Sequence, residues 1–183
     1  MYGLIHSSLK DMINEKYGEE IWQEVLASSG VPDASFLAMR SYDDEIIYSL
    51  VVAASEVLNA PADACLEMFG EYWVLETASK SYGMLLDAAG NDMLEFLGNM
   101  NSLHDRISST FINYVPPEFH IEKTDNGHLI HYVSKRKGLT PFVVGILKGL
   151  AIRFSSPLNI LDQVEVEVDE GTHTIFQIEL APK

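Results

Sequence analysis

Residues 116–136 read PPEFHIEKTDNGHLIHYVSKR, and this stretch decides the fold class. Before it, apolar residues recur every three or four positions, as on the buried face of a helix. After Pro116-Pro117, which must stop a helix, they recur every second position, as on a strand. Residues 119–123 and 129–133 flank the turn signal Asp125-Asn126-Gly127, which predicts a β-hairpin. We therefore expect the chain to change from helices to strands at the two prolines.

Working outward from the hairpin, helical periodicity occupies most of the preceding chain. It predicts helices at 2–13, 19–26, 43–57, 61–77 and 92–112. After the hairpin we expect one more helix at 141–154. Strands at 163–168 and 174–180 then face each other across Asp169-Glu170-Gly171.

This order predicts an α+β fold, with an N-terminal helical subdomain followed by a mixed half that has a mostly antiparallel sheet and helices. A parallel sheet is disfavoured because alternating strand and helix units are absent. With 183 residues and 20.4 kDa, the chain is expected to form a single domain, 1–183. The helical part would span about 1–60 and the mixed part about 61–183, and a ligand could sit at their interface.

The composition excludes several classes of partner and site. A formal net charge of −15 disfavours nucleic acid and anionic membranes, which bind clustered Lys and Arg. The single cysteine, Cys65, rules out an internal disulfide and a zinc site of paired cysteines, and it is expected to pack as a small hydrophobe. No signal sequence and no apolar run of about 18 residues is present. We therefore expect a soluble, cytoplasmic protein.

The first candidate for chemistry is His104. It lies on the apolar side of its predicted helix, close in the helical period to Leu97, Met100 and Ile107. A histidine on such a face is either a hydrogen-bonded core residue or a metal ligand, and its position alone leaves both open. His6 lies at the edge of the apolar stripe of the first helix, so we expect it at the surface rather than near a buried ligand.

A second candidate group is Tyr132, Ser134 and Arg136. Their spacing of two along a strand directs all three side chains to one face. A phenol, an alcohol and a guanidinium together form a hydrogen-bonding surface for carboxylates, and arginine can hold one carboxylate with two bonds. Haem carries two such groups, its propionates. The alternative is an exposed strand face within the basic stretch 135–137.

These residues carry a family resemblance. Tyr132-Val133-Ser134-Lys135-Arg136, Leu103-His104-Asp105-Arg106 and the start Met1-Tyr2-Gly3 resemble the H-NOX (haem nitric oxide/oxygen binding) family, which includes the haem domain of soluble guanylate cyclase. Phe69-Gly70-Glu71-Tyr72-Trp73, Pro116-Pro117 and the helix from Gly145 to Gly149 also fall in order. The resemblance therefore covers nearly the whole chain, and it is closest to the bacterial stand-alone type.

The resemblance implies a role for each matching residue. His104 would be the proximal ligand to the iron of haem b, enclosed by residues 61–183. Tyr132, Ser134 and Arg136 would hold the propionates, and Pro117 would press on the macrocycle as well as ending a helix. The residues expected on the opposite, gas-binding face are Ile5, Trp73, Thr77, Phe142 and Ile146.

The same resemblance bears on which gas binds. Bound dioxygen is stabilised by a hydrogen bond, whereas nitric oxide needs none. Oxygen-binding members of the family place a tyrosine after the Tyr-x-Ser-x-Arg motif, but residues 137–150 contain no tyrosine and their one aromatic is Phe142. We therefore expect nitric oxide and carbon monoxide as ligands, with oxygen excluded. The alternative is an oxygen sensor in which the indole N–H of Trp73 is the donor.

The resemblance implies a gas sensor rather than an enzyme. Nitric oxide would weaken the bond between iron and His104, and the freed helix would pass a signal to an effector in trans, either a histidine kinase or a cyclic-nucleotide enzyme. A haem peroxidase or oxygenase is a weaker alternative, because the expected gas-binding face has no titratable side chain. A carrier of apolar molecules without iron would leave His104 and the carboxylate-binding residues unexplained.

Overall fold

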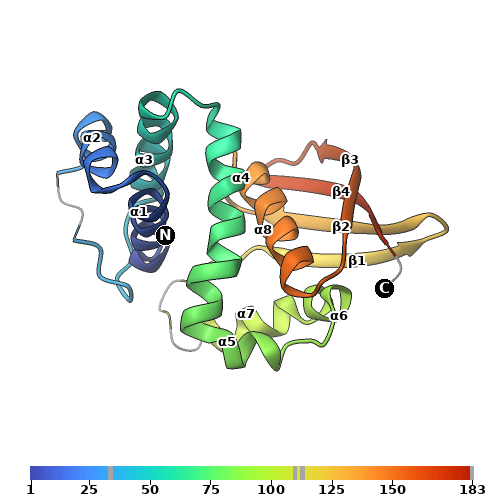
Figure 1. Cartoon of the computed structure of the whole chain (residues 1–183). Helices are drawn as coiled ribbons and strands as arrows, with labels where there is room; N and C mark the ends of the chain where they lie inside the picture. Colours follow the sequence, from blue (N-terminus) through green and yellow to red (C-terminus); the bar gives the residue numbers. More distant parts are fainter. Residues whose placement is uncertain (33–34, 109–110, 112–113, 182–183) are drawn as a thin grey trace.

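The computed structural model of the chain describes residues 1–32, 35–108, 111 and 114–181. Helices come first and strands later, as the change of period predicts (Figure 1). The elements are α1 (Gly3–Tyr17), α2 (Glu19–Ser29), α3 (Asp44–Val57), α4 (Ala62–Tyr72), a π-helix (Trp73–Ala78), α5 (Ser79–Asp87), α6 (Met93–Gly98), α7 (Met100–Ser108), β1 (Glu118–Thr124), β2 (Gly127–Ser134), α8 (Thr140–Arg153), β3 (Leu158–Val166) and β4 (Thr172–Leu180).

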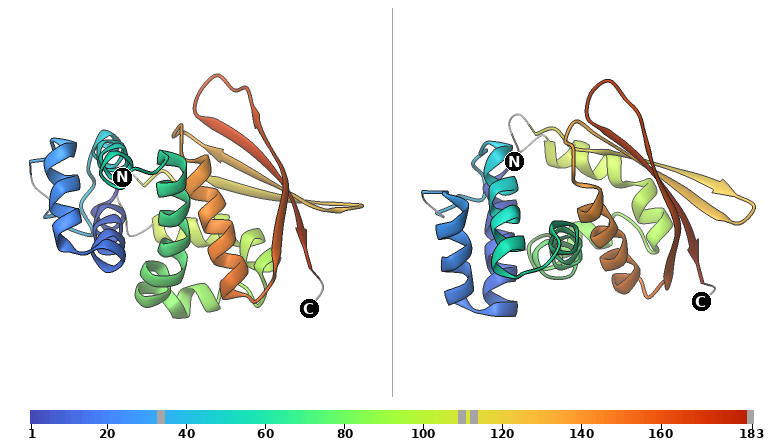
Figure 2. Two further views of the ribbon diagram at one scale, coloured as in Figure 1. Left: turned by 45° about the horizontal axis from the view of Figure 1, so that its top comes forward. Right: turned by 90° about the horizontal axis from the view of Figure 1, so that it is seen from above.

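The described strands form one antiparallel sheet in the order β1-β2-β4-β3. Tyr132 on β2 pairs with Phe119 on β1 and with Thr174 on β4, and all three side chains are buried. Their neighbours point to the other face, because side chains alternate along a strand. The helices lie on the buried side of the sheet (Figures 1 and 2). The α+β prediction is confirmed.

Buried apolar side chains gather in two clusters among the described residues. The first includes Trp22, Leu50 and Phe69, and it lies among α1, α2, α3 and α4. The second includes Leu97 and Phe176, and it fills the space between the sheet and the helices from the π-helix onward. Helices α4 and α8 run side by side between the two clusters (Figure 1).

Glycines allow α4 and α8 to approach closely. A Cβ atom added to Gly70 would stand 2.0 Å from the backbone oxygen of Phe142, and one added to Gly145 would stand 1.9 Å from the backbone oxygen of Glu67. No larger residue fits at these positions without moving a helix. The two glycines therefore set the short distance between α4 and α8 at which Phe142 packs against α4.

Several predicted boundaries are wrong. The helix expected at 92–112 is divided into α6 and α7, and its last turn falls partly on residues outside the described ranges. Helix α5 was not predicted. The helix expected at 61–77 changes to π-geometry at Trp73, and β3 begins at Leu158 rather than at 163.

Two single residues were also predicted, with different outcomes. His6 is fully buried rather than at the surface, because its ring stacks on Phe36 with ring centroids 4.7 Å apart and also contacts Tyr42. Cys65 is buried, as predicted.

Within the described ranges, no single helix is long and apolar enough to cross a membrane. Asp44–Val57 and Ala62–Asp87 reach that length and composition only as a pair, and this pair is bent by 113°.

Candidate haem site

His104 has the tautomer that a metal ligand requires. Its Nδ1 lies 3.1 Å from the carbonyl oxygen of Pro117, and since a carbonyl only accepts, Nδ1 must carry the proton. Burial lowers the pKa of His104 below its ordinary value, although the bond to Pro117 opposes this shift. The ring is therefore neutral near pH 7, and Nε2 presents a free lone pair.

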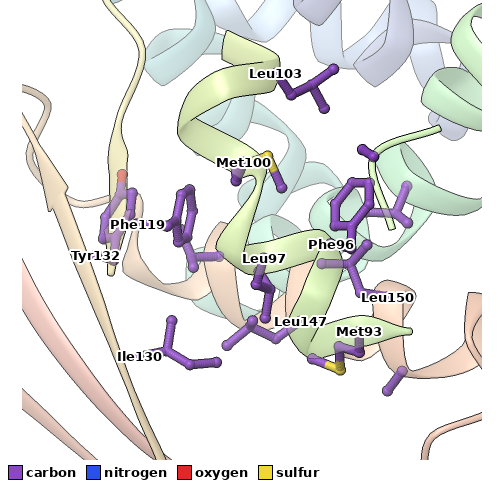
Figure 3. Packing of buried hydrophobic residues seen from close by; sticks show 14 of the residues in the cluster. Met93, Phe96, Leu97, Met100, Leu103, Phe119, Ile130, Tyr132, Leu147 and Leu150 are labelled. Atoms are coloured by element: carbon purple, nitrogen blue, oxygen red, sulfur yellow. The ribbon is translucent and has the colours of Figure 1, made fainter. Parts of the chain in front are cut away.

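Aromatic rings surround this imidazole. Tyr114 meets it edge to face with ring centroids 6.1 Å apart, and Phe119 lies at 6.4 Å. Phe119 in turn contacts Tyr132 at 5.6 Å (Figure 3). A ring thus separates the histidine of α7 from the phenol of β2. A flat, apolar ligand would find aromatic surface on this side of the molecule.

Asn101 connects the histidine helix to the sheet. Its side-chain oxygen accepts a hydrogen bond of 2.9 Å from the backbone N–H of Phe119, and its Nδ2 donates one of 2.8 Å to the carbonyl of the same residue. Pro117 is two residues away, so these bonds also fix the carbonyl that holds His104. Sequence reasoning missed Asn101, because an asparagine on a helix gives no sign of a distant backbone partner.

Tyr132, Ser134 and Arg136 come together as their spacing predicts. Tyr132 and Ser134 are buried and lie on the same face of β2. The Ser134 hydroxyl accepts a bond of 3.1 Å from the backbone N–H of Arg136. Burial raises the pKa of Tyr132, so the phenol keeps its proton as a donor. The three donor groups of the motif therefore form one continuous surface.

Arg136 also has protein partners that the sequence did not reveal. Its Nε donates to Asp44 of α3 over 2.7 Å, and its Nη1 donates to the backbone oxygen of Val115 over 2.9 Å. The N-terminal ammonium of Met1 also pairs with Asp44. Burial raises the pKa of Asp44, but the ammonium and Arg136 outweigh it and hold the pKa below its ordinary value. The guanidinium of Arg136 therefore binds a carboxylate in this structure, that of Asp44.

The residues expected on the gas-binding face lie at the boundary between the two apolar clusters. Ile5 and Phe142 pack against the N-terminal cluster, whereas Trp73 and Ile146 pack against the other. All four are half-buried. A flat, apolar ligand at this boundary could contact one cluster with each of its faces.

Two features shape this face without a signal in the sequence. Trp73 and Thr77 lie on the π-helix, a rare geometry that is frequent at functional sites. The Thr77 hydroxyl is 2.5 Å from that of Ser8, which joins the π-helix to α1 close to Ile5. Phe142 contacts Phe69 with ring centroids 5.0 Å apart. Its ring is apolar and offers no hydrogen-bond donor.

The residues present fit haem. A neutral histidine with a free Nε2 suits iron, the three donors suit two carboxylates, and the half-buried apolar side chains suit a flat macrocycle. The family model described as haem-NO-binding matches residues 2–161. The chain belongs to this haem-NO-binding (H-NOX) family. H-NOX domains are haem-binding gas sensors rather than enzymes, and the chain is one of them.

The relatives agree. Soluble guanylate cyclase gcy-34 of Caenorhabditis elegans is 32% identical over 191 residues, covering 97% of this chain and 28% of its own length. Soluble guanylate cyclase gcy-31 of the same organism is 28% identical over 180 residues, covering 97% of this chain and 26% of its own length. This H-NOX chain thus spans about a quarter of the curated relatives it matches.

Solved structures share the fold. An H-NOX protein from S. oneidensis in the Fe(II) ligation state superposes with a TM-score of 0.87 at 21% identity, covering 100% of this chain and 97% of that one. An oxygen-binding H-NOX domain related to soluble guanylate cyclases, in its oxygen complex, gives 0.83 at 21%, covering 100% and 96%. These similarities confirm the H-NOX fold.

Proposed function

We propose that this domain senses nitric oxide, and also binds carbon monoxide, at ferrous haem b held by His104. The assignment of His104 as the iron ligand rests on the hydrogen bond from its Nδ1 to the carbonyl oxygen of Pro117. This bond leaves the lone pair of Nε2 free and fixes the orientation of the imidazole ring. When bound, haem would supply an iron centre that can take a diatomic gas. Every other part of the function belongs to residues of the chain.

Tyr132, Ser134 and Arg136 hold the propionates in this proposal. The phenol and the guanidinium donate to carboxylate oxygens, and the Ser134 hydroxyl fixes the backbone of Arg136 by accepting from its N–H. Asp44 keeps Arg136 in place from the helical side. Pro117 contributes a rigid ring close to the histidine and limits how flat the macrocycle can lie.

The choice of gas follows from Ile5, Trp73, Thr77, Phe142 and Ile146. The residue that follows the carboxylate-binding motif and faces α4 is Phe142, which has no donor for bound oxygen. The Thr77 hydroxyl already has a partner in Ser8. Nitric oxide and carbon monoxide need no such donor, so we propose that they bind and that oxygen in air does not.

The signal begins at α7. If His104 released the iron, α7 would still be bonded to Phe119 through Asn101 and to Pro117 through Nδ1 of His104. Movement of α7 would therefore be transmitted to β1 and from there to β2, which carries Tyr132. Such a two-state contact between helix and sheet is what an allosteric switch needs. We propose that an effector in trans, a histidine kinase or a cyclic-nucleotide enzyme, detects this change.

The test is an absorption spectrum of the purified ferrous protein under argon, then with nitric oxide, with carbon monoxide and with air. We expect a Soret band that shifts with nitric oxide and with carbon monoxide. When oxygen is added to the anaerobic ferrous protein, the band should keep its ferrous position. A protein without a Soret band would refute the haem assignment. A reversible spectral change with oxygen would refute the oxygen exclusion while leaving the haem assignment intact.

The second candidate is an oxygen sensor that uses Trp73 as donor. The observation in its favour is that Trp73 is half-buried on the π-helix, beside the proposed gas-binding face. Trp73→Phe removes the indole N–H and keeps an aromatic ring. If the parent binds oxygen and this variant does not, the second candidate is correct. Phe142→Tyr makes the opposite change, and a new donor worth about 1–2 kcal/mol should bring oxygen binding into range.

A further inference from the structure

The outer face of the sheet carries histidines that the haem site does not use. Side chains alternate along β2 and β4, so Tyr132 and Thr174 point to the helices while His131 and His173 point away from them. In the described part of the chain the helices lie on the opposite side (Figures 1 and 2). Val133 pairs with His173, which makes the two histidines diagonal neighbours on this outer face.

The two imidazoles are spaced as ligands of one ion. Nδ1 of His131 lies 3.2 Å from Nε2 of His173, with the ring centroids 5.5 Å apart. A tetrahedral ion with zinc–nitrogen bonds of about 2.0–2.1 Å holds two nitrogens about 3.3–3.4 Å apart. The distance between the two nitrogens would need to grow by only about 0.1–0.2 Å, and the rings would turn so that both lone pairs meet at the ion.

Glu122 on β1 lies on the other side of His131. Its Oε2 is 3.9 Å from Nε2 of His131, whose side chain is only 23% exposed. A carboxylate near this nitrogen favours the tautomer with the proton on Nε2, so Nδ1 of His131 accepts the hydrogen bond from Nε2 of His173. An ion between the rings takes the place of that proton, and His173 then carries its proton on Nδ1. Histidine ligands of metals commonly donate their second nitrogen to a carboxylate, and Glu122 is close enough to His131 to take this role after a small side-chain rotation.

We propose that His131 and His173 bind a divalent transition-metal ion of the zinc class on the outer face of the sheet, with Glu122 as a positioning residue. Imidazole nitrogens suit zinc, copper and nickel rather than magnesium or calcium. The described residues contain no cluster of three protein ligands, so water completes the coordination. The bound ion joins β2 to β4 directly behind the pair formed by Tyr132 and Thr174.

The test is calorimetric titration of the haem-containing 183-residue chain with Zn²⁺, in buffer with millimolar Mg²⁺. The magnesium occupies weak, non-specific carboxylate sites on the surface, which are expected for a chain of net charge −15. We expect one Zn²⁺ per chain and an unchanged Soret band. His131→Ala and His173→Ala should each abolish this one-site binding, and Glu122→Gln should weaken it about tenfold.

His120→Ala is the matched control. His120 is exposed on the same face and pairs with His131 across the strands, but its Nε2 lies 3.5 Å from Glu118. We expect this variant to bind Zn²⁺ as the parent does. The proposal is overturned if it loses as much affinity as His131→Ala, or if removing either proposed ligand leaves binding intact. A Soret change at the same stoichiometry would place the ion at the haem and also overturn it. Circular dichroism of each variant identifies loss of fold.

Discussion

Replacing Arg136 with alanine tests how the proposed propionate clamp is built. In the structure Arg136 bonds to a carboxylate, that of Asp44, over 2.7 Å, with side chains 23% and 35% exposed. A charge-assisted bond to a propionate would use the guanidinium N–H groups that Asp44 and Val115 leave available. Its loss should cost about 1.5–3 kcal/mol, toward the lower end because water reaches the pair. Ser134→Ala removes a neutral hydroxyl and should cost about 1 kcal/mol.

Haem transfer to an excess of apo-myoglobin measures this difference. If the losses appear in the dissociation rate, Arg136→Ala should release haem about 10- to 150-fold faster than the parent, against about fivefold for Ser134→Ala. Arg136→Lys keeps the charge but not the planar fork, so its rate should fall between the parent and Arg136→Ala.

The matched control is Lys135→Ala, which removes a neighbouring charge from the exposed face of the same segment. Its haem should be released at the parent rate. The clamp is not built as proposed if Arg136→Ala behaves like this control, or if Arg136→Ala and Ser134→Ala release haem equally fast. Urea unfolding of each variant separates lost haem contacts from the lost bond to Asp44.

Three further outcomes are expected. His104→Gly should lose its haem unless free imidazole is added, because the histidine is the one protein ligand proposed for the iron; a full Soret band without imidazole would contradict the assignment. Asn101→Ala removes two half-buried hydrogen bonds and should lower the free energy of unfolding by about 2 kcal/mol, measured with urea, and no loss would mean that α7 is not held by them. Asp44→Asn should be less stable than the parent at pH 7. Since the pKa of Asp44 is lowered in the folded state, its contribution is present above its ordinary value of about 3.9 and disappears as pH falls through the lower, folded value. The difference in melting temperature should therefore shrink below about pH 4, and a constant difference would show that the Asp44 charge is not responsible.

Local patterns predicted the hairpin and the carboxylate-binding residues well. A turn of Asp-Asn-Gly and a strict period of two act over a few residues, so β1, β2 and the common face of Tyr132, Ser134 and Arg136 could be read directly. The position of His104 on an apolar helix face was equally local. What these residues bind is still a proposal.

Tertiary contacts explain most of the errors. The break between α6 and α7 falls at Asn99, whose side chain bonds to the carbonyl of Ala89, and one residue hardly disturbs the apolar period. In β3 an irregularity between Ile160 and Asp162 shifts the alternation, so the first half of the strand was missed. His6 is buried by rings about 30 positions away, which no local pattern contains.

The π-helix between α4 and α5 acts as a phase shift. An α-helix turns about 100° per residue, so any change in the number of residues per turn rotates everything that follows. The wider π turn takes up about one extra residue, so converting Trp73–Ala78 to regular α-geometry at the same length would turn α5 by about 100° relative to α4. Leu86, now buried in the second apolar cluster, would be carried away from it. The π-geometry of this segment therefore sets which face α5 turns toward the sheet.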